Sequence, residues 1–389
     1  MIARTLLRCN APARLVAPHR LSARGAATVS LLEMAHPGDT KDLEIYLEAH
    51  PQARIRCVLG KTEGNGCVND FTRGYASHVV EATMGDRCGD ASIIMSGGTE
   101  GILTPHLLLF ADEGAVGGGG TASTGSSTSP RLSMGVARTR TLLPHELGRR
   151  AQIEATRDAV LTACADAGLA PSELRFVQIK CPLLTPERVR RSEVACATED
   201  GYYSMALSRG ASALGVALAT GELPPDRLPG DDAEAAQFVC GELSLGSSVA
   251  SCSAGIELEH SEVFVLGNSA GSASSLRASA CVMSDPLDAP SVVRMLVEDA
   301  GLEMSHGQLT DASRRRVRAV LSKADPAPSV RGHRTTMCAD SDLHATRHSR
   351  AAVGGLLGGI FGETRLYVSG GAEHQGPHGG GPVCVIYEV

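Results

Sequence analysis

Two stretches of the sequence run from a short apolar segment into a serine that precedes a pair of glycines. The serines are Ser96 and Ser369. A serine hydroxyl can act as a nucleophile or as a hydrogen-bond donor. The glycines beside it let backbone N–H groups approach a ligand closely, which suits a carbonyl oxygen or an oxyanion. The two stretches therefore predict a site for a carbonyl compound.

Three other apolar segments that are typical of strands each end in a lysine. They supply Lys61, Lys180 and Lys323. Burial and neighbouring positive charges both lower the pKa of a lysine, so three lysines brought together cannot all stay protonated. A neutral lysine can accept the proton of a serine hydroxyl, which is the chemistry of serine–lysine hydrolases.

The order lysine, arginine, serine occurs three times along the chain. Downstream of each lysine, a hydroxyl residue precedes an arginine at the predicted start of a helix. Further on, a strand ends in a serine within a turn of small residues. The arginines are Arg73, Arg209 and Arg347, and the serines are Ser96, Ser269 and Ser369. An ordered triplet that recurs in this way predicts three homologous α/β units.

The unit boundaries follow from changes in composition. We expect repeat units at residues 34–128, 129–276 and 277–389, with a Gly/Ser-rich joint at 114–130. Residues 1–33 are rich in arginine and contain no acidic residue before Glu33. This composition is typical of a transit peptide and predicts a mitochondrial or plastid location; without such a leader the protein would be cytoplasmic.

The overall composition indicates which kinds of partner are not expected. The net charge is -7 and no basic block is present, so nucleic acid is not expected as a partner. No apolar run approaches the roughly 20 residues of a membrane-spanning helix, so no membrane segment is expected. The twelve cysteines include no C-x-x-C pair, which is typical of thiols in a reducing compartment.

The motifs themselves resemble one family. GKTEGNGCVNDFTRGYA, MSGGTEG, GNSAGSAS and SGGAEHQGPHGGG are similar to sequences of the cyanuric acid amidohydrolase/barbiturase family of ring-opening amidases. The resemblance extends from about residue 34 to the C-terminus. It implies an α/β fold of three units around a pseudo-threefold axis, an active site at their junction, a homotetramer, and no organic cofactor. It also implies hydrolysis of a C–N bond in a cyclic imide.

The second unit differs from the other two at its serine, which indicates a different role. It reads Gly267-Asn268-Ser269-Ala270 instead of Ser-Gly-Gly. The resemblance likewise implies that the nucleophile and its base come from the middle unit. We therefore predict Ser269 as nucleophile and Lys180 as base, with Ser272 and Ser274 as alternative nucleophiles.

The remaining residues of the triplets are expected to bind substrate. Cyanuric acid has three carbonyls that alternate with three N–H groups, so three equivalent sets of donors can meet it. Serine attack would give carboxybiuret, which loses carbon dioxide to leave biuret. The alternative substrate is barbituric acid, which would give ureidomalonate. The expected substrate-binding residues are Lys61, Arg73, Ser96, Gly97, Arg209, Ala270, Lys323, Arg347, Ser369 and Gly370.

The C-terminal loop resembles the cation loop of the same family, in which backbone carbonyls and a glutamine side chain join an acidic residue. An oxygen-only ligand set suits Mg²⁺ or Ca²⁺ in a structural role. The ligands implied are Asp325, Ala372, Gln375, Gly376, Pro377 and Gly380. His344 and His348 have the i, i+4 spacing of a zinc pair, but no third ligand is evident.

Two other classes of function are disfavoured. A non-catalytic ligand-binding relative would be expected to have lost a lysine or a serine, and all are present. LGKTEGNG resembles a phosphate-binding loop, but Ile55 stands where that motif needs its first glycine.

Overall fold

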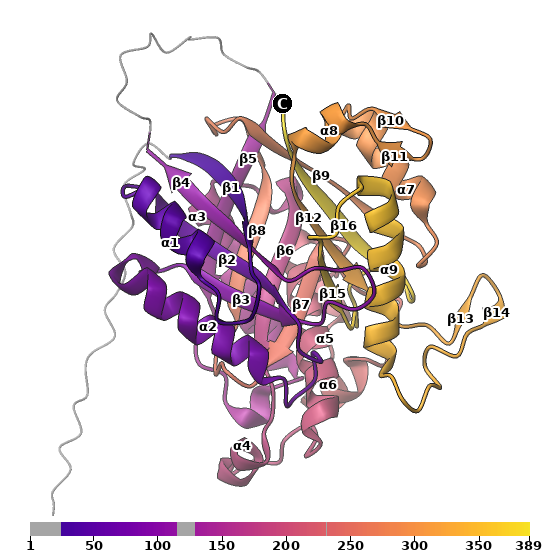
Figure 1. Ribbon diagram of the computed structural model, residues 1–389. Helices are drawn as coiled ribbons and strands as arrows, with labels where there is room; N and C mark the ends of the chain where they lie inside the picture. The colour runs from indigo at the N-terminus through magenta and orange to yellow at the C-terminus, as the bar shows by residue number, and fades with distance from the viewer. Residues whose placement is uncertain (1–24, 115–128, 231) are drawn as a thin grey trace, which may run out of the picture.

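The computed structural model describes residues 25–114, 129–230 and 232–389. These residues form three α/β units, each built on a four-stranded sheet, as the sequence repeats predict (Figure 1). The first unit comprises β1 (Ala26–Glu33), α1 (Lys41–Ala49), β2 (Arg54–Thr62), α2 (Phe71–Met84), β3 (Ser92–Gly97) and β4 (His106–Glu113).

The second and third units repeat this order with insertions. The second comprises β5 (Arg131–Arg138), α3 (Arg150–Ala167), β6 (Leu174–Pro182), α4 (Pro186–Arg191), α5 (Gly201–Thr220), α6 (Asp232–Phe238), β7 (Ala250–Gly255) and β8 (Glu262–Ser269). The third comprises β9 (Leu276–Met283), α7 (Ala289–Arg294), β10 (Met304–Ser305), β11 (Gln308–Leu309), α8 (Asp311–Arg316), β12 (Val317–Ala324), β13 (Ser329–Val330), β14 (His333–Arg334), α9 (Ala345–Phe361), β15 (Tyr367–Gly370) and β16 (Gly381–Glu388).

The three sheets share one topology. Their strand orders are β1-β4-β2-β3, β5-β8-β6-β7 and β9-β16-β12-β15. In each sheet the strand that carries the lysine is β2, β6 or β12. It pairs parallel with the strand at the edge of the sheet, which is β3, β7 or β15, and antiparallel with the last strand of the unit, which is β4, β8 or β16. The register of the lysine strand also shifts by one residue at the same place in all three, around Arg56, Arg175 and Arg318. A bulge adds local twist, so its repetition gives the three sheets the same curvature.

Helices cover the outer faces of the sheets, and the inner faces meet in a common core. Figure 1 shows α1 and α2 on one side of the strands and α9 on the opposite side. Apolar side chains of all three sheets form the central cluster, in which the rings of Phe110 and Phe264 pack edge to face at 4.8 Å. Separate clusters join each sheet to its own helices. All three lysine strands therefore contribute side chains to this common core.

The helices that carry the arginines begin at residues whose side chains cap the free N–H groups of the first turn. Asp70 accepts from the Thr72 amide at the start of α2, and Asp200 accepts from two amides at the start of α5. His344 caps α9 through its ring. Such caps fix where a helix starts and thus where its arginine lies.

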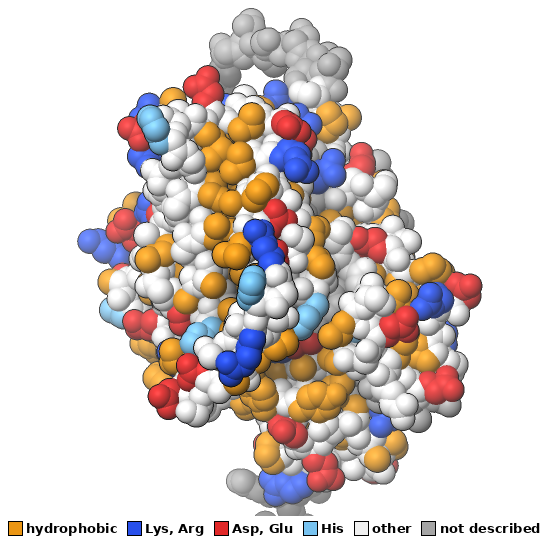
Figure 2. Space-filling model, turned by 90° about the vertical axis from the view of Figure 1, so that its right-hand side faces the viewer, with side chains coloured by type: hydrophobic (Ala, Val, Ile, Leu, Met, Phe, Trp, Pro, Cys, Tyr) orange, Lys and Arg blue, Asp and Glu red, His pale blue; other side chains and the backbone are white. Residues whose placement is uncertain are grey.

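The structure corrects the predicted boundaries of the first unit. Residues 26–33 form β1, which pairs with β4 along its whole length, so the leader predicted to extend to Glu33 is too long. Residues 1–24, and most of the joint predicted at 114–130, lie outside the described residues. Among the described helices, none is long and apolar enough to cross a membrane. On the face in Figure 2, positive and negative side chains are interspersed.

Candidate active site

Strand register pairs each buried lysine with a serine of its own unit. Lys61 lies opposite Ser96 in the β2–β3 pair, and Lys323 lies opposite Ser369 in the β12–β15 pair. The Nζ–Oγ distances are 3.3 Å in the first unit and 3.1 Å in the third. Opposite residues of parallel neighbours point to the same face, so each pair faces the centre.

In the second unit the residue opposite Lys180 is Ser253, not the predicted Ser269. Ser269 ends β8, the last strand, where Gly267 lies opposite Leu174 of β6. Leu174 precedes Lys180 by six residues, which is roughly 20 Å along a strand. The structure therefore does not bring Ser269 to Lys180.

The residues around Ser269 are bonded elsewhere. The Ser269 hydroxyl donates to the carbonyl of Gly168, Ser272 to Leu132, and Ser274 to Ala27. These contacts place all three candidate serines of the sequence prediction away from the lysines. The substrate-binding position predicted for Ala270 therefore belongs to Ala254, which follows Ser253 in β7.

A signal for Ser253 is present in the sequence. Each of the three serines that face a lysine is followed four residues later by a glutamate, and these are Glu100, Glu257 and Glu373. No glutamate follows Ser269 at this spacing, because that position holds Ala273. The segment between α5 and β7 lengthens the second unit and hides the correspondence.

The lysines also link the units in a ring. The Nζ of Lys61 donates to the carbonyl of Val368 at 2.8 Å, and that of Lys180 donates to the carbonyl of Met95 at 2.7 Å. Lys323 donates to the carbonyl of Cys252. Each acceptor immediately precedes the site serine of another unit. The six side chains therefore converge where the three units meet.

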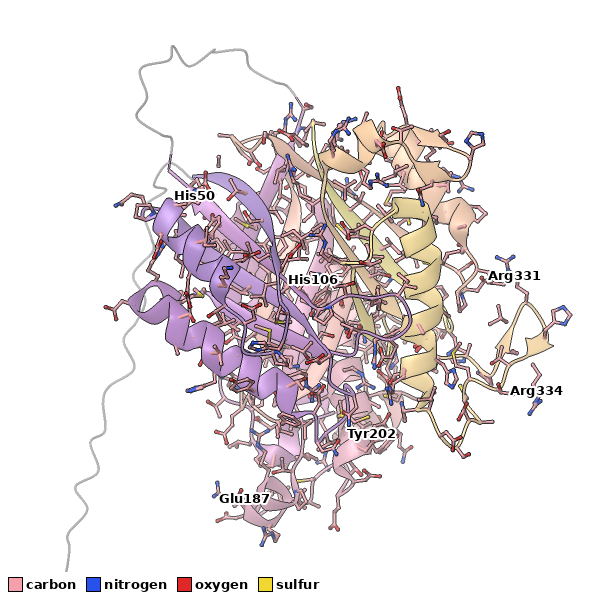
Figure 3. The ribbon with its side chains drawn as sticks, viewed as in Figure 1. His50, His106, Glu187, Tyr202, Arg331 and Arg334 are labelled. Carbon is pink, nitrogen blue, oxygen red and sulfur yellow. The ribbon has the colours of Figure 1, made fainter. Side chains whose placement is uncertain are left out.

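The three lysines have lowered pKa values. Their side chains are at most 1% exposed, and this burial is the largest cause in every case. The pKa of Lys323 is lowered to about 7, and that of Lys61 lies well below its ordinary value. His106, opposite Lys61 in the β2–β4 pair, lies among the strands in Figure 3, and burial lowers its pKa to about 4. Neutral lysine, the form a base requires, is therefore accessible here.

Two arginines form matching ion pairs between units. Arg209 on α5 binds both oxygens of Glu373, and Arg350 on α9 binds both oxygens of Glu100, each with contacts of 2.7 and 2.6 Å. The third member of the set is Arg73 on α2. Such two-point pairs hold an arginine in a fixed orientation.

The prediction of Arg347 is corrected to Arg350. The side chain of Arg350 is 3% exposed, whereas that of Arg347 is 36% exposed and touches Glu100 only through its Nε. Both arginines follow a hydroxyl residue, Thr346 or Ser349, at one turn of helix from each other. The sequence pattern fits either residue, and only the helix orientation selects the buried one.

We expect Arg350→Ala to raise KM by about 100-fold and to destabilise the protein by about 3 kcal/mol, because it leaves Glu100 buried without its main partner. Arg347→Ala is the matched control, and we expect less than about a threefold change in KM and at most about 1 kcal/mol in stability. Steady-state kinetics and chemical unfolding of the two variants check this. A larger effect at Arg347 would contradict the assignment.

The predicted cation loop is assembled, and its residues fit a cation in part. Asp325 is buried, and desolvation raises its pKa despite bonds from the amides of Ala372 and Gly379 and a contact with His378. A cation would offset this buried charge. The side-chain oxygen of Gln375 is not directed at this cation site, because it accepts a hydrogen bond from the Cys252 amide at 2.6 Å.

The histidines do not form a zinc site. His344 contacts Tyr202, which Figure 3 labels on α5, and His348 pairs with Asp340. Nowhere in residues 25–114, 129–230 and 232–389 do three His, Cys, Asp or Glu side chains gather as a metal ion would require.

The fold and this site together are those of a hydrolase with three repeated units that bring serine–lysine pairs to their junction. The chain matches the family described as "Amidohydrolase ring-opening protein" over residues 28–388. It therefore belongs to the ring-opening amidohydrolases, which hydrolyse C–N bonds in cyclic amides.

Individual relatives agree with this family. A cyanuric acid amidohydrolase of Ectopseudomonas oleovorans is 46% identical over 376 residues, which cover 92% of this chain and 98% of that protein. One of Rhizobium johnstonii is 48% identical over 361 residues, covering 90% and 95%. A solved structure, "Cyanuric acid hydrolase: evolutionary innovation by structural concatenation", matches with a TM-score of 0.85 and 43% identity over 94% of this chain and 100% of that one. The solved structure of the cyanuric acid hydrolase from A. caulinodans matches with a TM-score of 0.81 and 41% sequence identity, over 93% of this chain and 99% of that one.

Proposed function

We propose that the protein opens the ring of cyanuric acid by hydrolysis, giving carboxybiuret and then biuret and carbon dioxide. The observation that carries this is the threefold arrangement of lysine–serine pairs. Three equivalent sets of donors match the three carbonyls of this ring. The names of the relatives support the same substrate.

Ser253 is the proposed nucleophile and Lys180 its base. Neutral Lys180 takes the proton of the Ser253 hydroxyl while Oγ bonds to one carbonyl carbon, whose oxygen becomes an oxyanion. Backbone N–H groups beside the serine stabilise this oxyanion. As the tetrahedral intermediate collapses, the ring C–N bond breaks and the Lys180 ammonium returns the proton to nitrogen. Water, deprotonated by Lys180, then cleaves the acyl-enzyme.

The other two pairs bind and polarise the remaining carbonyls. Lys61 with Ser96 and Lys323 with Ser369 supply hydrogen-bond donors, and Gly97 and Gly370 allow backbone amides to approach. Arg73, Arg209 and Arg350 hold the loops that follow the serines and add fixed positive charge at the ring.

The test is hydrolysis of cyanuric acid and barbituric acid side by side by the purified protein. Turnover of cyanuric acid is the expected result. Turnover of barbituric acid alone would instead make the protein a barbiturase, because that ring carries CH₂ in place of one N–H group. Turnover of neither ring would contradict the proposed function.

The cation remains part of the proposal. Asp325 and the carbonyls of the 372–380 loop would hold Mg²⁺ or Ca²⁺, which would supply structural support to the loop after Ser369. We expect Asp325→Asn to lower the melting temperature and to abolish the stabilisation that added Mg²⁺ or Ca²⁺ gives the wild type. Thermal unfolding with EDTA and with each metal checks this. A wild type that responds to neither metal would contradict the site.

Two further parts of the proposal concern the whole protein. A homotetramer is proposed from the resemblance and is tested by light scattering of the purified protein. A mitochondrial or plastid location is proposed from the leader and is tested by imaging the N-terminal residues fused to a fluorescent protein.

A further inference from the structure

The three glutamates that follow the site serines do not have equivalent partners. Glu100 and Glu373 are each bound at both oxygens by an arginine of another unit. The third glutamate, Glu257, lies 3.1 Å from the Nζ of Lys180. Within the described part of the chain, no ion pair or hydrogen bond joins Glu257 to Arg73. The threefold symmetry of the site is thus broken at one carboxylate.

The glycine two residues after each serine also has a different neighbour in the second unit than in the other two. At Gly98 and Gly371, an added Cβ would lie 2.4 and 2.8 Å from the guanidinium of the neighbouring arginine. At Gly255 the nearest atom would instead be a carboxylate oxygen of Glu257, at 2.1 Å. Glu257 therefore occupies the place that an arginine fills in the other two units.

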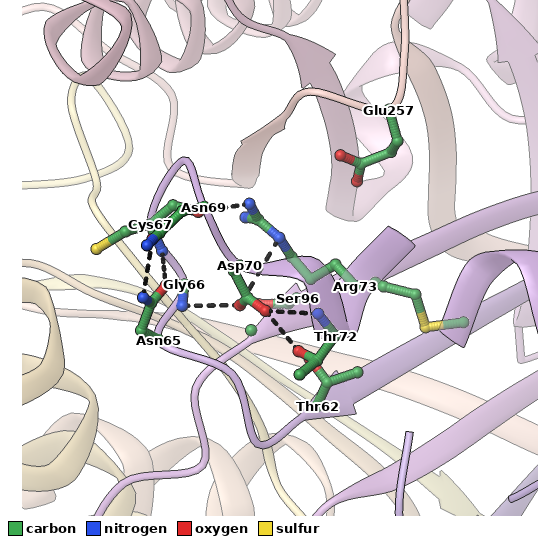
Figure 4. A network of polar contacts seen from close by, with 12 residues as sticks. Thr62, Asn65, Gly66, Cys67, Asn69, Asp70, Thr72, Arg73, Ser96 and Glu257 are labelled. Carbon is green, nitrogen blue, oxygen red and sulfur yellow. Dashed lines mark hydrogen bonds and ion pairs between the residues drawn. The ribbon is translucent and has the colours of Figure 1, made fainter. Parts of the chain in front are cut away.

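Asp70 accounts for the position of Arg73. Arg73 donates to the carbonyls of Ala254 and Cys67, and its Nε faces the Asp70 carboxylate at 3.8 Å (Figure 4). The residues three positions before the other two arginines are Ala206 and Arg347, so neither offers a carboxylate. Of these three arginines, Arg73 alone has an acid three residues before it, and its guanidinium is held by Asp70 and two carbonyls while Glu257 contacts Lys180.

An insertion of the second unit holds the Glu257 loop. Arg188 on α4 donates to the carbonyls of Ile256 and Leu258, on either side of Glu257, at 3.2 and 2.6 Å. The first unit passes from β2 to α2 without such a helix, and the third has the β13–β14 hairpin there. The hydrogen bonds from Arg188 to the Glu257 loop are therefore specific to the unit that contains Ser253.

We propose that Glu257 is a positioning residue that makes Ser253 and Lys180 the reacting pair, forming a Ser253–Lys180–Glu257 triad. Its carboxylate orients the Lys180 amine and stabilises the ammonium that forms when Lys180 takes the serine proton. The proton then passes to the leaving nitrogen and the carboxylate stays ionised throughout. In the part of the chain that the structure describes, no carboxylate forms an ion pair with Lys61 or Lys323, and these two lysines serve the other carbonyls. This inference rests on the reaction proposed above.

The groups acting on Lys180 define the expected pH effect. They are Glu257 after β7, Arg73 on α2 and Cys181 on its own strand. Burial lowers the pKa of Lys180 and Glu257 opposes that shift. Activity needs neutral Lys180, so kcat falls as the pH drops through the Lys180 pKa. Removing the carboxylate lowers this pKa further, which moves the acidic limb of the profile to lower pH.

The experiment measures kcat against pH for wild type, Glu257→Gln, Glu100→Gln and Glu373→Gln, all with cyanuric acid. We expect Glu257→Gln to lose about 10- to 100-fold in maximal kcat, the usual effect of a hydrogen bond to a charged group. Its acidic limb should move down by about one pH unit, with KM nearly unchanged. The two controls should raise KM and leave the limb in place.

A second route avoids dependence on one variant. Asp70→Asn should free Arg73 to pair with Glu257 and so lower kcat with the same shift, and adding Glu257→Gln should cause no further loss. Glu257→Asp should recover part of the activity. An unshifted limb in Glu257→Gln, or equal limb shifts in all three glutamine variants, would overturn the triad. Inactivity of Ser253→Ala in the same series would show that the proposed reaction itself still holds.

Discussion

Ser253→Ala is expected to abolish ring opening, with a loss of at least about 10⁴-fold in kcat. The hydroxyl that attacks the carbonyl is removed, and the remaining donors can only bind the ring. Ser253 is 7% exposed and the substitution removes one oxygen, so the fold should be retained. The measurement is turnover of cyanuric acid at saturating substrate, with the melting temperature as a check on folding.

Ser269→Ala is the matched control, since this serine ends β8, another strand of the same sheet. We expect wild-type kcat and KM, because its hydroxyl donates to the Gly168 carbonyl and accepts from the Gly271 amide, both at 3.3 Å, on the far part of the sheet. Activity that survives in Ser253→Ala and disappears in Ser269→Ala would reverse the assignment. Ser96→Ala and Ser369→Ala should weaken binding, since these hydroxyls face the other two carbonyls.

Lys180→Met is expected to reduce kcat by about 10²- to 10⁴-fold, which is the usual contribution of a general base. Methionine has nearly the same length but accepts no proton. Because burial lowers the pKa of Lys180, the wild-type enzyme should be active above that pKa and lose activity as the pH falls through it. The variant should lose this pH dependence together with its activity.

Lys180→Arg separates the base from the charge. A guanidinium keeps the positive charge and the hydrogen-bond donors but cannot lose its proton in the working range. We expect this variant to be as inactive as Lys180→Met. If it retained more than about a tenth of the wild-type kcat, the role of Lys180 would be electrostatic and the base would lie elsewhere.

Much of the architecture could be read from the sequence because it depends on local patterns. Each lysine strand has a basic residue five positions before the lysine, and the structure shows that this residue is the bulge. The Ser-Gly-Gly turns of the first and third units stand directly after short apolar strands. These signals lie within a few residues of one another, so insertions elsewhere do not disturb them.

The tertiary structure alone decided which serine and which arginine complete the set. Ser253 lies near the end of β7 and Ser269 ends β8, and the choice depends on which of these strands pairs parallel with β6. Arg347 and Arg350 both follow a hydroxyl residue on α9, and the choice depends on which face of the helix packs inward. Strand register and helix rotation arise from contacts between distant segments, which no local pattern records.

The broken symmetry at Glu257 has the same origin. The sequence alone predicted a recurring order of lysine, arginine and serine, and it contains a glutamate four residues after each serine that faces a lysine. Which carboxylate meets a lysine depends on Arg73 of the first unit, which donates to the Ala254 carbonyl, and on Arg188 of the second unit, which donates to the carbonyls on either side of Glu257. Only the packing of the three units around one centre brings those charges together.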